Sequence, residues 1–152
     1  MKPYRIFTAV AALGVVALLA GVWGSRPRTL GVREGRLLPC PASPNCVSSF
    51  ESGEHGMNAV PHTGTPPEVM NVVAQVLASF PRTTLLTQKG NYAHFAARSP
   101  RLGFVDDVEV LVTDSHIHFR SASRLGYDDL GVNRERMTRL ARKLREHFEG
   151  QL

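Results

Sequence analysis

The chain has two cysteines, Cys40 and Cys46, and thiols at this spacing can serve redox chemistry, metal binding or a disulfide. Redox pairs usually follow a C-x-x-C pattern, whereas these two follow C-x5-C, and no helix start directly after the first cysteine would activate its thiolate. A zinc site would need further ligands, and no His follows Cys46 at the customary spacing. The redox role is therefore disfavoured, while a disulfide, free thiols and a metal clip stay open until the compartment is known.

The densest group of polar side chains lies between residues 120 and 134, where two guanidinium groups and two hydroxyls precede a helix start. Arg makes bidentate contacts with anions, and helix N-termini attract them. This segment is therefore a candidate site for a carboxylate, a phosphate or a sugar. The candidate ligand-binding residues are Arg120, Ser121, Ser123, Arg124, Tyr127, Asp128, Asn133 and Arg134.

The same side chains also have a purely structural interpretation, in which they pair with one another inside the protein. Arg120 and Arg124 would then form ion pairs with carboxylates, and Asn133 would cap the last helix. The acidic candidates for these pairs are Asp106, Asp107, Glu109 and Asp128. The sequence favours this internal network over a ligand site.

A hydrolase is the alternative function. Its nucleophile would be Ser121 or Ser123, its base His116 or His118, and its orienting acid Asp106 or Asp107. These residue types are common and the G-x-S-x-G motif is absent, so an enzyme is not favoured. His94 could join the two other histidines around a metal, but partly exposed histidines are common on strands, and we expect neither a metal nor a cofactor.

The elements that position these residues follow a helix, strand, helix order. Thr65 is expected to cap a helix that has Pro66 at its first position and a capping box closed by Glu68. Pro81 ends this helix. Alternating apolar and polar residues then predict strands at 83–88, 92–99, 104–113 and 116–123, joined as two hairpins by turns at 89–91 and 114–115.

The short turn at 114–115 also predicts a register for the second hairpin. Val110 would face Phe119 and Val112 would face Ile117 on the core side, while Glu109 would face Arg120 on the other side. A last amphipathic helix covers residues 133–148. We expect an α+β fold, with a four-stranded antiparallel sheet of two hairpins and two helices on one face, preceded by an N-terminal membrane segment.

The N-terminus begins with basic residues followed by an uncharged apolar run at 6–23, which is long enough as a helix to cross a bilayer at about 1.5 Å per residue. We assign residues 1–24 to a membrane anchor or a cleaved signal peptide, 25–38 to a basic tether, and 39–150 to a single α+β domain. Basic residues flank the run on both sides, so charge alone does not fix the orientation of the domain.

The net charge of +5 is concentrated on the last helix. Its basic residues are Arg134, Arg136, Arg139, Arg142, Lys143 and Arg145. A basic helix face can contact anionic lipid or simply remain hydrated. Nucleic acid is not an expected partner, because no aromatic-rich binding motif accompanies the charge.

Three segments resemble the signature motifs of a known family: CPASPNCVSS, GFVDDVEV and FRSASRLGYDDLGVNRERM. They occur in the order found in the domain of unknown function family 1499, and the resemblance covers about residues 38–144. Members of this family are small, mostly bacterial proteins that commonly follow an export signal or a membrane segment. The resemblance implies no particular activity, and it favours an exported domain.

With export favoured, Cys40 and Cys46 are expected to form a disulfide, since thiol pairs persist oxidised outside the cytoplasm. The protein would then lie at the bacterial inner membrane with its domain in the periplasm, or be secreted to the periplasm if the signal is cleaved. Its expected partners are the membrane, through the N-terminal segment, and an anionic small molecule or an envelope protein.

Overall fold

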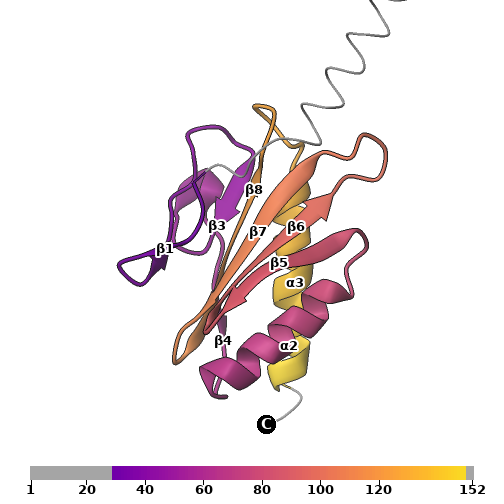
Figure 1. Ribbon diagram of the computed structural model, residues 1–152. Helices are drawn as coiled ribbons and strands as arrows, with labels where there is room; N and C mark the ends of the chain where they lie inside the picture. The colour runs from indigo at the N-terminus through magenta and orange to yellow at the C-terminus, as the bar shows by residue number, and fades with distance from the viewer. Residues whose placement is uncertain (1–28, 150–152) are drawn as a thin grey trace, which may run out of the picture.

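The computed structural model describes residues 29–149 and has an α+β fold (Figure 1). The predicted membrane segment lies outside the described residues. No helix within residues 29–149 combines the length and apolar character needed to span a bilayer.

The main sheet is antiparallel and contains six strands. Its four long strands are β5 (Thr83–Lys89), β6 (Tyr92–Arg98), β7 (Val105–Val112) and β8 (His116–Ser123). These are the four strands predicted from the alternating pattern, and β6 also pairs with β7, so the two hairpins form one continuous meander.

The predicted count of four strands is wrong, because β3 (Cys46–Ser48) and β4 (Val60–Pro61) both pair with β8 and extend the sheet. Both strands lie in the proline-rich segment that precedes the first helix. Strands of three and two residues are too short to show an alternating pattern, so only their pairing with a distant strand identifies them.

The register predicted for the second hairpin is confirmed. Val110 pairs with Phe119, Val112 with Ile117, and Glu109 with Arg120. Because side chains alternate across a sheet, this register directs the apolar pairs toward the core and the Glu109–Arg120 pair toward the opposite face.

Two helices, α2 (Pro66–Ala78) and α3 (Val132–Glu149), pack on the same face of the sheet (Figure 1). The capping box of α2 is present, since the backbone N–H and hydroxyl of Thr65 both donate to Glu68 Oε2, at 3.2 and 2.6 Å. Apolar side chains from both helices join those of the sheet in one core, which includes Met70, Leu77, Phe95, Phe119, Met137 and Leu140.

The opposite face of the sheet is covered by the start of the described chain. Strands β1 (Val32–Arg33) and β2 (Arg36–Leu37) form a small hairpin that contacts β7 and β8. Gly31 N–H donates to Glu109 Oε1 at 2.6 Å, and Leu37 is buried. This hairpin lies within residues 25–38, the predicted tether, so part of that segment is folded against the domain.

A disulfide joins Cys40 to Cys46, with their Cα atoms 5.7 Å apart. Cys40 follows the β1–β2 hairpin, and Cys46 begins the edge strand β3, so the bond links the covering segment to the main sheet. For a loop of this length the chain-entropy relation gives a stabilisation of about 2.4 kcal/mol. A short segment η1 (Gly53–His55) follows β3 and leads toward β4.

Candidate functional site

The sheet divides the predicted polar cluster between its two faces. Asp106 on β7 lies opposite Ser123 on β8. The side chains of both residues, and that of Ser121, face the helices. Asp107 and Arg120 occupy alternate positions and face the covering hairpin. Neighbours in the sequence therefore belong to two separate networks.

The helix-side network links the sheet to the start of α3. Arg136 donates to Asp106 Oδ2 at 2.6 Å and to Ser121 Oγ at 3.1 Å. Ser123 Oγ donates to Asp106 Oδ1 at 2.6 Å. These side chains satisfy one another, so this network is structural.

Asn133 lies at the centre of this network, and its predicted role as a cap is wrong. Its buried amide accepts from Ser121 Oγ at 2.5 Å and donates to the Asn45 backbone oxygen and to Ser123 Oγ. The carboxylate at the helix start belongs instead to Asp129, which accepts the Asn133 backbone N–H at 2.6 Å.

On the other face, Glu109 and Arg120 form a fully buried ion pair. Their side chains are 0% and 2% exposed, and Arg120 Nη1 lies 2.8 Å from Glu109 Oε2. Tyr92 donates its hydroxyl to Glu109 Oε1 at 2.9 Å. Burial, followed by the negative charge of Glu109, raises the pKa of Tyr92 and keeps it a neutral donor.

On the same face, two side chains bind the carboxylate of Asp107. His94 Nε2 lies 2.7 Å from Asp107 Oδ1, and Arg124 donates to both carboxylate oxygens at 2.8 to 3.1 Å. Burial alone would raise the pKa of Asp107, but the hydrogen bonds and charges of His94 and Arg124 outweigh it and lower the pKa. The predicted pairing of Arg120 and Arg124 with buried acids is thus present.

Of the residues proposed for a hydrolase, Ser123 and Asp106 are hydrogen-bonded to each other, but both serines lie apart from the histidines. Ser121 and Ser123 face the helices, whereas His118 faces the other side, where it stacks on Phe50 with ring centroids 4.1 Å apart. Burial, then the charges of His116 and Arg36, lower the pKa of His118. The hydroxyl group hydrogen-bonded to His118 is that of Ser49, whose Oγ lies 3.2 Å from His118 Nδ1, and not that of Ser121 or Ser123. Within residues 29–149, no three His, Cys, Asp or Glu side chains are grouped to hold a metal.

Three predicted site residues remain near the surface. Tyr127 is 75% exposed, and Asp128 accepts the Leu130 backbone N–H in an exposed turn. Arg134 lies in the first turn of α3, is half-buried, and donates to the backbone oxygens of Gly56 and Glu54. Arg134 alone of the predicted binding residues lines a large open cleft beside α3.

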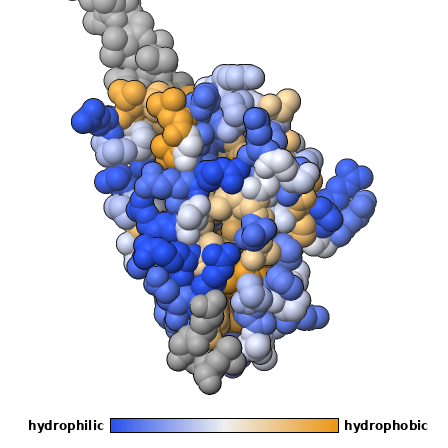
Figure 2. Space-filling view, turned by 180° about the vertical axis from the view of Figure 1, so that it is seen from behind, coloured by the Kyte–Doolittle hydropathy of each residue, from blue (hydrophilic) through white to orange (hydrophobic). Residues whose placement is uncertain are grey.

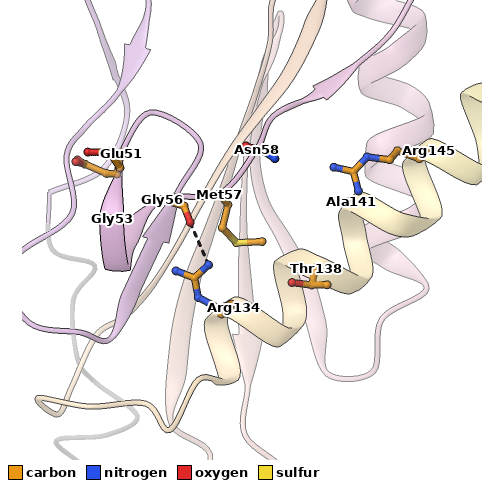
Figure 3. Close-up of a pocket in the computed structure, with 10 residues that line it drawn as sticks. Glu51, Gly53, Gly56, Met57, Asn58, Arg134, Thr138, Ala141 and Arg145 are labelled. Carbon is orange, nitrogen blue, oxygen red and sulfur yellow. Dashed lines mark hydrogen bonds between the residues drawn. The ribbon is translucent and has the colours of Figure 1, made fainter.

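This cleft has a volume of about 590 Å³ and separates the loop at residues 51–58 from α3 (Figure 3). Residues spaced along one stripe of the helix form one wall: Arg134, Thr138, Ala141 and Arg145. Loop residues form the other wall: Glu51, Ser52, Gly53, Gly56, Met57 and Asn58.

The two guanidinium groups in the cleft differ in their partners. Arg134 is held by the loop backbone, whereas Arg145 makes no hydrogen bond or ion pair with any described residue. In Figure 3 the Arg145 side chain extends from α3 toward Asn58, across the cleft. Glu51 is the acidic residue in the lining, and its Oε1 atom accepts the Cys40 backbone N–H at 3.2 Å. The cleft is therefore rich in donors and basic at its α3 side.

Arg145 belongs to the basic helix face predicted from the sequence, but no sequence pattern assigned it to a site. The signal was present in part, because Arg134, Thr138 and Arg145 recur at helical spacing. The loop at residues 51–58 gave no comparable signal, since it meets α3 only in the folded chain.

Comparison with known proteins gives one result. The family model described as "Protein of unknown function (DUF1499)" matches residues 36–144, which is more than half of the chain. Neither the curated proteins nor the solved structures contain a match. The matched residues include both cysteines of the disulfide, the buried networks and most of the cleft, so the chain belongs to the DUF1499 family of proteins of unknown function.

Proposed function

We propose that this protein is a bacterial envelope protein whose domain binds an anionic small molecule in the cleft between α3 and residues 51–58. Residues 1–24 would hold it at the inner membrane with the domain in the periplasm, or release it there after cleavage. The role is binding rather than catalysis, and nucleic acid is not a partner. Arg134 is the link between this cleft and the segment at 120–134 that the sequence indicated.

The observation that carries this proposal is the side chain of Arg145. A guanidinium group has five N–H donors and usually pairs with a carboxylate or a backbone oxygen when it is partly buried. Arg145 is half-buried and lines the cleft without such a partner in the described chain. An external anion would satisfy it.

The other donors in the lining suit the same class of ligand. Thr138 and Ser52 have hydroxyl groups, Asn58 has an amide, and Arg134 adds a second positive charge. Carboxylates and phosphates accept several hydrogen bonds at once, and charge-assisted bonds are about twice as strong as neutral ones. The lining therefore favours a ligand with a carboxylate or phosphate group over a neutral sugar.

Titration of the full-length protein in detergent micelles with sodium phosphate or sodium succinate, at constant ionic strength, tests the proposed cleft. We expect saturable heat with at least one anion, and Arg145→Gln should weaken the binding about tenfold or more, since one charge-assisted contact is worth about 1.5–3 kcal/mol. Arg142→Gln is the matched control, because it removes the same charge from an exposed position that pairs with Glu146.

Two results would contradict the proposed cleft. One is the absence of saturable binding with either anion. The other is equal weakening by Arg142→Gln and Arg145→Gln, which would indicate attraction to the general charge of the helix rather than a site.

Alkylation of intact cells that express the full-length chain tests the proposed compartment. Cys40 and Cys46 should resist alkylation until a reductant is added, because an exported disulfide stays oxidised. Mass spectrometry of the same sample shows whether residues 1–24 are retained, which distinguishes an anchor from a cleaved signal. Free alkylation of both thiols before reduction would contradict an envelope location.

A further inference from the structure

Exposed apolar side chains gather at one end of the domain. Two loops lie there, residues 99–104 between β6 and β7 and residues 124–131 between β8 and α3 (Figure 1). Figure 2 also shows apolar side chains grouped at the upper end of the molecule. We call this surface the apolar end, and it consists of Leu102, Phe104, Leu125, Tyr127, Leu130 and Val132.

The two loops form one continuous surface. Arg124 N–H donates to the Val105 backbone oxygen at 3.0 Å, which joins the loops where β7 begins and β8 ends. Phe104, Leu125 and Val132 line a shared hollow of about 200 Å³. A partner could therefore contact both loops at once.

Leu130 is the most exposed member of this surface, at 91%. Its backbone has a φ of 55°, in the left-handed region that residues with a Cβ rarely adopt. The turn is held in place by neighbouring carboxylates, since Asp128 accepts the Leu130 N–H at 2.7 Å and Asp129 accepts the Gly131 N–H at 3.2 Å. The fold thus fixes a leucine side chain in solvent, which suits an apolar contact outside the domain.

The short connection to the predicted membrane segment indicates what that contact is. The apolar run ends at Trp23, and the first described residue is Thr29. Six peptide units span about 22 Å at most, at roughly 3.6 Å each. A domain attached by so short a connection stays beside the bilayer and must turn one surface toward it.

The position of the connection is compatible with the apolar end facing the lipid. Gly31 is bound to Glu109 on β7, and Glu109 lies about 13 Å along the strand from Val105, where β7 meets the apolar end. The connection is long enough to cover this distance. The opposite end of the strands has polar turns, at residues 89–91 and 113–115, and is unsuited to lipid.

Basic residues around this surface match the charge of anionic lipid. Arg98 immediately precedes the loop at 99–104 and Arg101 lies within it, both exposed, and Arg26 and Arg28 lie in the connection. The acidic residues of the other loop, Asp128 and Asp129, accept backbone N–H groups of their own turn. Tyr127 combines an apolar ring with a hydroxyl, a combination enriched at membrane interfaces. Apolar side chains flanked by basic ones are typical of surfaces that bind at the boundary between head groups and acyl chains.

We propose that the apolar end docks on the surface of the anionic bilayer to which residues 1–24 attach the protein, with Leu130, Leu102 and Tyr127 entering the lipid interface. This proposal rests on the membrane attachment proposed above. Docking would fix the orientation of the domain and leave the cleft at α3 open to the periplasm.

A tryptophan placed at residue 130 tests the docking. The full chain carries Trp23→Phe, which removes the single native tryptophan, together with Leu130→Trp. The protein is reconstituted in vesicles of phosphatidylcholine and phosphatidylglycerol, with or without brominated acyl chains. We expect a blue-shifted emission that brominated lipid quenches by about twofold or more. Leu86→Trp is the matched control, because Leu86 is also an exposed leucine, at 50%, on β5.

The outcomes separate docking from attachment. Quenching at residue 130 but not at residue 86 supports docking. If the protein sediments with the vesicles and residue 130 is not quenched, docking is overturned while attachment stands. A blue shift without quenching indicates a protein contact, such as a second copy, and equal quenching of both positions indicates unspecific adsorption; each overturns docking. Failure to sediment with the vesicles overturns attachment and docking together.

Discussion

Replacement of Glu109 by alanine is expected to lower the free energy of unfolding by about 3–5 kcal/mol. The change leaves the Arg120 guanidinium, which is 2% exposed, without its carboxylate partner in the interior. Arg120 Nε already has no hydrogen-bond partner in the described chain. Loss of Glu109 would also leave Arg120 Nη1 without its carboxylate acceptor. The change also removes the acceptor of the Tyr92 hydroxyl and of the Gly31 N–H. The bond from Gly31 attaches the covering hairpin to β7.

Urea denaturation followed by far-UV circular dichroism measures this loss. Glu135→Ala is the matched control, since Glu135 forms an exposed pair with Arg139 and its removal should change stability by about 0.5 kcal/mol or less. The double variant Glu109→Leu/Arg120→Met should recover the part of the loss that comes from the unpaired Arg120, because apolar residues of similar volume can replace a buried pair, but Tyr92 and Gly31 still lack their acceptor. A single Glu109→Ala variant as stable as the control would show that water already reaches Arg120.

Asp107→Asn is expected to destabilise the domain by about 2–3 kcal/mol at neutral pH, because hydrogen bonds to charged groups are worth about 1.5–3 kcal/mol. The variant keeps the shape of the side chain but removes the charge between His94 and Arg124. Since the pKa of Asp107 is lower in the folded protein, the wild type gains this stability above the ordinary carboxyl pKa of about 3.9. The gain disappears as the pH falls through the folded pKa.

Urea denaturation of the wild type and of Asp107→Asn between about pH 7 and pH 2 measures this change in the free energy of unfolding. The difference in unfolding free energy should be largest above about pH 5 and should shrink below about pH 4. Asp114→Asn provides the control, since Asp114 lies in the exposed turn between β7 and β8. A difference that stays constant down to the lowest pH would show that the charge of Asp107 does not stabilise the fold.

The two buried networks bind many of the polar side chains of the motif segments to one another, so few of these side chains are available to a ligand. On one face, Asn133 and Arg136 attach α3 to the sheet. On the other, Glu109 attaches the covering hairpin. The cleft beside α3 lies outside these networks and has polar side chains in its lining that remain accessible.

The elements with a local signal were predictable from the sequence. The capping box at Thr65 fixes the start of α2 through contacts within four residues. The alternation of Val108, Val110 and Val112 against Ile117 and Phe119, together with a short turn, determines both the strands and their register. The motif segments identify the family for a similar reason, because they are stretches of the sequence itself.

The placement of the site was decided by the tertiary structure. Residues 120–124 form a single polar cluster in the sequence, but the sheet divides them between two faces because strand side chains alternate. Strands β3 and β4 exist only through pairing with β8, about 55 to 76 residues away. Arg134 and Arg145 line a cleft only because the loop at 51–58 packs against α3. Local pattern is determined by the neighbouring residues in the chain, whereas contacts between distant segments depend on how the whole core packs, and the sequence by itself does not display them.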